Sequence, residues 1–500
     1  MNYNQNILAI DQSTSATKVL LVNANGQIVQ RCTEKHHSYY PQPDWVEHDP
    51  VEIWRNTQTA ILRVFTESSI RMQSIAAVAI TNQRETVVVW DRNTGEPVYN
   101  AIVWQCQRGA ETCKRLSDQG HSERVKEKTG LIIDPYFSAT GIQWILDHVT
   151  DARKKAEAGD LVFGTMDAWL IYQLTGKKVF ATDISNASRT MLFNIHELKW
   201  DDDLLNLLDI PFAMVPDVLF SDAIFGYTEV GDLFDRAIPI TSVMGDSHAA
   251  LFGQHCFDPG MAKATLGTGS SVIMNIGEEP QKSPGGLVTS IGWGRGSRVN
   301  YILEGNIHCT GDTINWLVND LQLLDTAAES EQVALSVQNN NNVYLVPAFA
   351  GLGAPYWENR ARATISGMPR STNKAHIVRA ALEAIAYQLR DLIESMAQTP
   401  EFTLKELRVD GGPTRNDFLM QFLADMLDCK IIRTRAEEIS AMGTAYMAGL
   451  TVGVWQNLDE LQALRCVDRE FFPEMDEDLR FRLYHGWQRA VQSVLNAAKA

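Results

Sequence analysis

Residues 9–18, with the sequence AIDQSTSATK, join an apolar strand to a hydroxyl-rich turn that ends in a lysine. We expect the turn amides, the hydroxyls and Lys18 to face the phosphates of a nucleotide. Asp11, at the end of the strand, is expected to order Mg²⁺ through water. An ordinary polar turn has the same composition, so this stretch indicates a fold only together with the rest of the chain.

A second stretch repeats this plan in the other half of the chain. Residues 261–266 are mostly apolar, residues 267–271 read GTGSS, and residues 272–274 are apolar again. The same order of strand, small hydroxyl-rich turn and strand predicts an internal duplication. We expect the boundary between the two halves near residues 253–260.

Helix-like and strand-like stretches alternate between the two hairpins, which is typical of α/β architecture. Residues 50–65 and 141–148 have helix-like patterns, whereas residues 75–80 and 86–90 are strand-like. In the second half, apolar residues recur at helical spacing over residues 376–396, where we expect a well-packed helix.

Glycines between a strand and a helix form a third element of interest. Residues 407–410 are strand-like, Gly411 and Gly412 follow, and a helix carrying Leu419 and Phe422 comes next. Backbone N–H groups at such a junction can face an anion or a nucleotide. Neither a Gly-x-x-x-x-Gly-Lys-Ser/Thr sequence nor a His-Arg-Asp catalytic loop is present, which excludes the P-loop and protein-kinase frameworks.

Bulk composition excludes several classes of protein. The 500 residues are 45% apolar and 21% charged, which is typical of a folded enzyme of two or three domains. A net charge of −17 argues against nucleic acid as a partner. Residues 1–5 resemble no export signal, and no apolar run reaches the roughly 18 residues of a membrane span. Seven scattered cysteines without a Cys-x-x-Cys pair indicate reduced thiols in the cytoplasm.

Five further runs carry a resemblance to a known family. They are residues 81–86 (TNQRET), 100–105 (NAIVWQ), 133–138 (IDPYFS), 186–194 (NASRTMLFN) and 351–357 (GLGAPYW). These runs resemble the glycerol kinases of the FGGY carbohydrate kinase family, and the resemblance spans almost the whole chain. It implies an α/β fold of two actin-like (ribonuclease H-like) lobes with an interdomain catalytic cleft. Residues 1–253 would form the polyol-binding lobe and residues 254–500 the nucleotide-binding lobe.

The resemblance also implies roles for individual residues. Asp246 is the general base for the attacking hydroxyl, and Asp11 is the carboxylate associated with magnesium. The positions that contact the polyol are Arg84, Glu85, Trp104, Tyr136 and Asp246. The positions that contact ADP or ATP are Thr14, Ser15, Ala16, Lys18, Thr268, Gly311, Asn315, Gly412 and Asn416. Without the resemblance, Arg84 and Glu85 would be interpreted as a surface ion pair and Trp104 as a core aromatic residue.

The chain departs from the glycerol kinase pattern in the first phosphate turn, at Ser13, Ser15, Ala16, Thr17 and Lys18, and at two positions of the polyol pocket. Ser247 stands where a glutamine normally follows the catalytic aspartate, and Ser271 stands where a phenylalanine normally packs on the glycerol carbons. We expect these serines to make the polyol pocket wider and wetter, which favours a four- or five-carbon polyol. Lys18 replaces an arginine and keeps its charge without the bidentate fork.

The sequence therefore predicts ATP-dependent phosphorylation of a terminal hydroxyl of a small polyol, with Mg²⁺ and with glycerol as the first candidate. One alternative is a kinase for a longer polyol or a ketose, such as erythritol or xylitol. Another is a non-catalytic actin-like ATP sensor, although such a protein needs no base in the cleft. A Gly-Asp-Ser hydrolase centred on Ser247 is disfavoured, because the Asp-x-x-His sequence at residues 118–121 lies upstream of the serine. The resemblance implies a homodimer or homotetramer.

Overall fold

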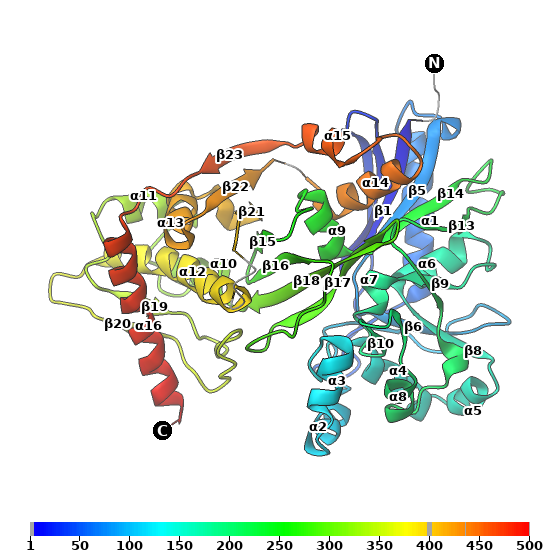
Figure 1. Cartoon of the computed structure of the whole chain (residues 1–500), viewed down its shortest axis with the longest axis horizontal. Helices are drawn as coiled ribbons and strands as arrows, with labels where there is room; N and C mark the ends of the chain where they lie inside the picture. The colour runs from blue at the N-terminus through cyan, green and yellow to red at the C-terminus, as the bar shows by residue number, and fades with distance from the viewer. Residues whose placement is uncertain (1–4, 398–402, 436, 500) are drawn as a thin grey trace.

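The structure is a computed structural model that describes residues 5–397, 403–435 and 437–499 (Figure 1). Residues 1–4, part of the segment in which we expect no export signal, lie outside this range. Within it, no helix is both long enough and apolar enough to cross a membrane. Two large sheets lie side by side along the long axis of the molecule, and helices pack around each of them (Figure 1).

The first large sheet has six strands in the order β13-β14-β5-β1-β2-β3. β1, β2 and β3 form an antiparallel meander, and β5 and β14 continue the sheet parallel to β1. The strands are β1 (Asn6–Gln12), β2 (Ala16–Val22), β3 (Ile28–Lys35), β5 (Ile75–Asn82), β13 (Ile224–Tyr227) and β14 (Pro239–Gly245).

The second large sheet has seven strands in the order β17-β18-β16-β15-β21-β22-β23. β15, β16 and β18 are antiparallel, and β21 and β22 run parallel to β15. This arrangement repeats that of β1, β2, β3, β5 and β14, so the predicted duplication and the two actin-like lobes are confirmed. The strands are β15 (Met261–Leu266), β16 (Ser270–Gly277), β17 (Val288–Arg295), β18 (Arg298–Ile307), β21 (Glu406–Asp410), β22 (Lys430–Thr434) and β23 (Val467–Phe471).

Smaller sheets extend both lobes. A four-stranded sheet in the order β4-β7-β6-β8 lies beside the first large sheet, and three pairs of short strands complete the set. Their bounds are β4 (Glu47–His48), β6 (Val87–Asp91), β7 (Ala101–Ile102), β8 (Leu161–Thr165), β9 (Ala181–Asp183), β10 (Phe193–Asn194), β11 (Lys199–Trp200), β12 (Asp217–Leu219), β19 (Tyr344–Val346) and β20 (Thr364–Ser366).

Some of the helices begin at a residue whose side chain caps them. The Asp49 side chain accepts a hydrogen bond from the amide of Val51 at the start of α1, and Asn373 and His376 form a capping box at the start of α12. The helices predicted over residues 50–65, 141–148 and 376–396 are confirmed within a few residues. The bounds are α1 (Pro50–Thr66), α2 (Ala110–Asp118), α3 (Ser122–Thr129), α4 (Ser138–His148), α5 (Ala152–Glu157), α6 (Met166–Leu174), α7 (Ile184–Ala187), α8 (Asp202–Leu207), α9 (Asp246–Gly253), α10 (Gly311–Asn319), α11 (Glu329–Leu335), α12 (Lys374–Met396), α13 (Asp417–Leu427), α14 (Ile439–Thr451), α15 (Leu458–Ala463) and α16 (Glu477–Lys499).

Helix α14 comes from the second half of the chain but packs against β1, β5 and β14 of the first sheet, and against α9. Glycines allow the two helices to cross closely. A Cβ atom on Gly443 would lie 1.8 Å from the carbonyl oxygen of Ala249, and one on Gly253 would lie 2.4 Å from that of Ile439. This crossing fixes α9, whose first residue is Asp246, against α14.

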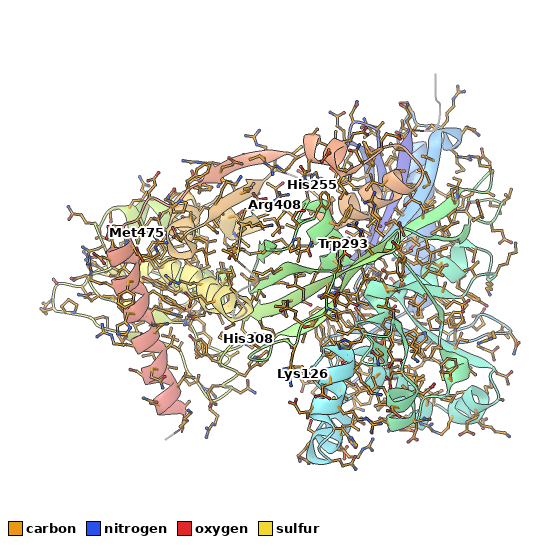
Figure 2. All side chains as sticks on the ribbon, viewed as in Figure 1. Lys126, His255, Trp293, His308, Arg408 and Met475 are labelled. Carbon is orange, nitrogen blue, oxygen red and sulfur yellow. The ribbon has the colours of Figure 1, made fainter. Side chains whose placement is uncertain are left out.

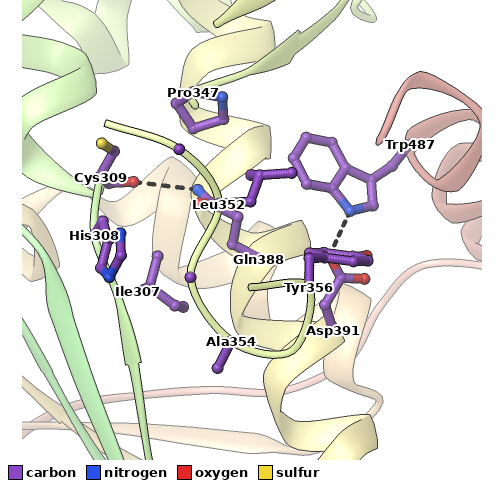
Figure 3. Close-up of a pocket in the computed structure, with 12 residues that line it drawn as sticks. Ile307, His308, Cys309, Pro347, Leu352, Ala354, Tyr356, Gln388, Asp391 and Trp487 are labelled. Atoms are coloured by element: carbon purple, nitrogen blue, oxygen red, sulfur yellow. Dashed lines mark hydrogen bonds between the residues drawn. The ribbon is translucent and has the colours of Figure 1, made fainter. Parts of the chain in front are cut away.

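The C-terminal helix α16 is fixed to α12 by buried polar contacts (Figure 3). Trp487 donates its indole N–H to Asp391 over 2.7 Å, and Tyr484 donates its hydroxyl to the other oxygen of Asp391 over 2.7 Å. The loop over residues 351–357 lies beside this contact and lines a cavity of about 10 Å³ with His308 and Gln388. That volume is about that of one water molecule.

Candidate active site

One cavity, here called the central cavity, is lined by residues from both large sheets and has a volume of about 430 Å³. The predicted phosphate hairpins contribute Asp11 and Lys18 from β1 and β2, and Ser271 from β16. Asp246 and Ser247 reach the same cavity from the start of α9. Residues that are far apart in the sequence therefore meet in one space between the lobes.

A second cavity of about 540 Å³, here called the second-lobe cavity, lies next to the central cavity. The two are neighbours because Gly411 lines the first and Gly412 the second. Apolar side chains of α10, α12 and α13 form part of its wall. Five predicted nucleotide-contacting residues line it: Thr268, Gly311, Asn315, Gly412 and Asn416.

Asp246 is positioned by a strand-to-helix junction. β14 ends at Gly245, and α9 begins with Asp246, so the carboxylate lies at the positive end of the helix dipole. The Nε atom of Arg84 lies 3.3 Å from Oδ1 of Asp246. The carboxylate therefore faces the central cavity with a fixed cation beside it.

Arg84 belongs to a buried cluster of alternating charges. Its guanidinium donates to both carboxylate oxygens of Glu304 over 2.9 and 3.1 Å. Arg189 donates to Glu85 over 2.7 Å and lies 2.9 Å from Glu304. All four side chains are buried, so the surface ion pair that Arg84 and Glu85 would suggest alone is wrong.

Glu304 is the electrostatic centre of this cluster. Burial raises the pKa of its carboxyl group, but the guanidinium groups of Arg189 and Arg84 outweigh burial and hold the pKa well below its usual range. Because Glu304 lies on β18 of the second lobe and Arg84 follows β5 of the first, this ion pair also joins the two lobes.

Aromatic side chains extend the cluster toward the first hairpin. Tyr136 accepts a hydrogen bond from Arg84 over 3.3 Å, and its ring lies 5.4 Å from that of Trp104 in an edge-on arrangement. The Trp104 indole N–H donates to the Thr14 hydroxyl over 3.0 Å. Trp104 is only partly buried, so it is no core residue. The predicted polyol residues thus form one continuous chain of contacts that ends at the phosphate hairpin.

The remaining hairpin residues differ in position. Thr14, Ser15 and Ala16 line neither the central nor the second-lobe cavity. Lys18 does line the central cavity, where it forms an ion pair with Glu438. Ser271 also lines it, and its hydroxyl oxygen is buried without a hydrogen-bond partner among the described residues.

Asp11 is the predicted magnesium-associated residue. Burial raises the pKa of its carboxyl group to about 7; Lys18 opposes this shift, while Asp246 and Glu438 add to it. One carboxylate oxygen, Oδ1, has no hydrogen-bond partner within the described part of the chain. Magnesium is commonly bound by one or two carboxylates, water and substrate phosphates, and this carboxylate fits that chemistry.

Several residues of the site were not assigned a role from the sequence. They are Arg189, Lys263, Glu304, Asp410 and Glu438, of which the first and third join the charge cluster and the others line the central cavity. The sequence could have indicated a role for two of them, because Lys263 and Glu304 are single charged residues within apolar strands. Such a charge requires a partner or a function.

The sequence matches the N-terminal domain of the FGGY family of carbohydrate kinases over residues 6–253, and the C-terminal domain of that family over residues 262–452. It is 50% identical to glycerol kinase 1 of Thermotoga maritima over 98% of this chain and 99% of the relative. It is 52% identical to a glycerol kinase of Carboxydothermus hydrogenoformans over 97% of each chain.

Solved structures with the same fold include glycerol kinase of Plasmodium falciparum with ADP. That chain superposes with a TM-score of 0.94 at 37% sequence identity, over 98% of each chain. A xylulose kinase of Lactobacillus acidophilus superposes with a TM-score of 0.88 at 20% identity, again over 98% of each chain. The second likeness concerns the fold alone.

Proposed function

Since the chain belongs to the FGGY family of carbohydrate kinases, we propose that it transfers the γ-phosphoryl group of ATP to a terminal hydroxyl of glycerol. The product is glycerol 3-phosphate. The observation that carries this proposal is that Asp246 and Asp11, from different elements, line one cavity beside the second-lobe cavity. The glycerol kinases to which the chain is about half identical support the choice of glycerol.

Asp246 acts as the general base in the proposed reaction. Its carboxylate accepts the proton of the attacking hydroxyl as the oxygen–phosphorus bond forms, and the bond to the β,γ-bridging oxygen breaks with its electron pair on ADP. Arg84, 3.3 Å away, holds the carboxylate in position. Water competes as an acceptor, so closure of the lobes around the cavity favours transfer to the polyol.

The charge cluster and the aromatic residues orient the acceptor. Arg84 donates to hydroxyl oxygens, Glu85 accepts from hydroxyl groups, and Trp104 and Tyr136 cover the carbon chain. Because Arg189 and Glu304 fix the first two side chains from behind, the site is ordered before the polyol binds.

ATP occupies the second-lobe cavity and extends its phosphates past Gly411 into the central cavity. Apolar side chains such as Leu382 and Ile385 suit a flat base, and Thr268, Gly311 and Gly412 allow backbone N–H groups to approach phosphate oxygens. Thr14, Ser15, Ala16 and Lys18 approach the phosphates from the first lobe. Asp11 would hold Mg²⁺, which supplies positive charge to the phosphates when bound.

A coupled assay of ADP release with ATP, Mg²⁺ and glycerol tests this function. We expect turnover that requires glycerol, and glycerol 3-phosphate as the product by ³¹P NMR. ATP consumption at the same rate with and without glycerol would contradict the proposal, because it would show that the polyol is no acceptor.

One observation favours a longer acceptor as a second candidate. The Ser271 hydroxyl is buried and unpartnered within the described residues, and it shares the central cavity with Ser247. An extra substrate hydroxyl would satisfy it, as a four- or five-carbon polyol or ketose can. Comparison of kcat/KM for glycerol, erythritol, xylitol and related ketoses decides between the candidates, because a higher value for glycerol excludes the second.

The division of labour between lobes follows from the same proposal, with residues 1–253 binding the polyol and residues 254–500 the nucleotide. Assembly into a homodimer or homotetramer and a cytoplasmic location stay predictions. Light scattering of the purified protein measures the first, and fractionation of the source cells the second.

A further inference from the structure

Four lysine and arginine residues are buried as whole residues in the described part of the chain, and they differ in how their charge is balanced. Arg84, Arg189 and Arg408 each have a carboxylate partner within 4.0 Å. Arg408, labelled in Figure 2, pairs with Glu406 on the same strand. Lys263 is 3% exposed, yet no carboxylate among the described residues lies within that distance of its ammonium group. Lys263 is therefore the exception in this set.

Lys263 lies on β15, which forms part of the wall of the central cavity. Side chains two residues apart on a strand share a face, so Lys263 and Thr265 face the same side. The Nζ atom of Lys263 donates to the Thr265 hydroxyl over 3.1 Å. Thr265 in turn lies opposite Ser271 on β16 and Asp410 on β21, and all of these residues line the cavity. The ammonium group is thus directed toward the cavity.

Among the described residues that line the central cavity, Lys263 is the cation whose charge no carboxylate within 4.0 Å balances. Lys18 also lines the cavity, but its charge is balanced by the ion pair with Glu438. An ammonium group has three donors, and the described structure provides Lys263 with one acceptor. A buried charge without a partner is costly. An anionic ligand that enters the cavity would remove that cost and use the remaining donors.

We propose that Lys263 contacts the phosphoryl group in transfer and is a further catalytic residue of this site. The proposal rests on the proposed function, because it assumes transfer of the γ-phosphoryl group of ATP. It does not depend on which acceptor receives that group. As the bond to the acceptor oxygen forms and the bond to the bridging oxygen of ADP breaks, the equatorial oxygens of the γ-phosphoryl group carry the negative charge. Lys263 donates hydrogen bonds to one of these oxygens, while Asp246 takes the hydroxyl proton.

The stability of the ligand-free protein distinguishes a purely structural role for Lys263 from the proposed catalytic role. If Lys263 only balanced the cavity carboxylates, its replacement by methionine would lower the melting temperature of the ligand-free protein. If Lys263 is unpaired until an anionic ligand binds, Lys263→Met removes a buried unpaired charge and keeps the length of the side chain. The ligand-free variant should then melt at the same temperature as the wild type or higher.

The experiment compares Lys263→Met with the wild type by calorimetric titration of ADP and of AMP-PNP, an ATP analogue that is not transferred, both with Mg²⁺. We expect ADP affinity within about twofold of wild type, and AMP-PNP affinity lowered about tenfold or more through loss of a charge-assisted hydrogen bond. We also expect kcat to fall about 10²- to 10³-fold. Lys430→Met is the matched control, because it removes a lysine from β22 of the same sheet whose partners are Glu406 and Glu470.

Two outcomes would overturn the inference: equal loss of ADP and AMP-PNP affinity, or a ligand-free melting temperature clearly below wild type. A second variant, Lys263→Gln, guards against a steric effect of methionine and should show the same preference for ADP. Because nucleotide titration needs no acceptor, failure of the wild type to phosphorylate glycerol would contradict the proposed function and leave this test intact.

Discussion

The Nε atom of Arg84 lies 3.3 Å from Oδ1 of Asp246. The contact couples the end of β5 to the start of α9, and it joins the buried charge cluster to the central cavity. Asp246 is partly exposed to that cavity, whereas Arg84 is buried. A fixed cation beside an accessible carboxylate holds that carboxylate in one orientation, and it leaves the other side of the carboxylate free for a substrate.

Replacement of Asp246 by asparagine tests the assignment of the base. Asp246→Asn keeps the size of the side chain and removes proton acceptance, so we expect kcat to fall about 10²- to 10⁴-fold. Affinities for ADP and the polyol should stay close to wild type by calorimetry. Turnover equal to wild type in the coupled assay would show that another group accepts the proton.

Glu304 should be the most costly member of the charge cluster to neutralise. Glu304→Gln removes a negative charge that balances the buried guanidinium groups of Arg84 and Arg189. We therefore expect the free energy of unfolding to fall by about 3–5 kcal/mol. Urea denaturation measures it. Glu437→Gln is the control, because Glu437 forms an exposed ion pair with Arg31 and should change stability by less than about 1 kcal/mol. Equal effects of the two variants would contradict the structural role of the cluster.

The crossing of α9 and α14 predicts a steric effect at Gly443. Gly443→Ala places a Cβ atom 1.8 Å from the carbonyl oxygen of Ala249, so the helices must move apart, at a cost of about 1–3 kcal/mol. Asp246 begins α9, so kcat should fall as well. Gly231→Ala is the control, because a Cβ atom there meets nothing within 4 Å. A Gly443→Ala enzyme with wild-type stability and turnover would show that the helices are not closely packed.

Asp391 predicts a pH dependence of stability. Burial raises the pKa of its carboxyl group from 3.8 to about 6, although Trp487 and Tyr484 donate hydrogen bonds to it. A raised pKa in the folded state contributes stability below pH 4 that is lost as the pH rises through 6. The free energy of unfolding of wild type relative to Asp391→Asn should therefore fall by about 3 kcal/mol between pH 4 and pH 7. A difference that rises over this range would show a lowered pKa instead.

The sequence predicted the parts of the fold that depend on local pattern. Alternating strands and helices, the two hairpins and the glycine junction after Asp410 are local features, and the structure contains each of them. The packing of α14 on the first sheet was not predicted. It depends on contacts between residues more than 190 positions apart, such as the hydrogen bond from the Thr444 hydroxyl to the carbonyl oxygen of Ile80 on β5, and no periodicity within α14 encodes its partner.

The candidate site was predicted unevenly for a related reason. Arg84 lies in a run that carries the family resemblance, and Asp246, Gly311 and Gly412 were assigned as single positions that match the family. Glu304 and Lys263 lie in strands that would otherwise be interpreted as core. Their roles depend on which face of a strand borders the cavity, and that is decided by the pairing of strands distant in sequence.

The most direct test of the account is a crystal structure of the chain with Mg²⁺, ADP and glycerol. We expect ADP in the cavity lined by Thr268, Gly311 and Gly412, and a terminal glycerol hydroxyl within hydrogen-bond distance of Asp246. ADP bound elsewhere, or a polyol separated from Asp246 with no path for the phosphoryl group between them, would contradict it.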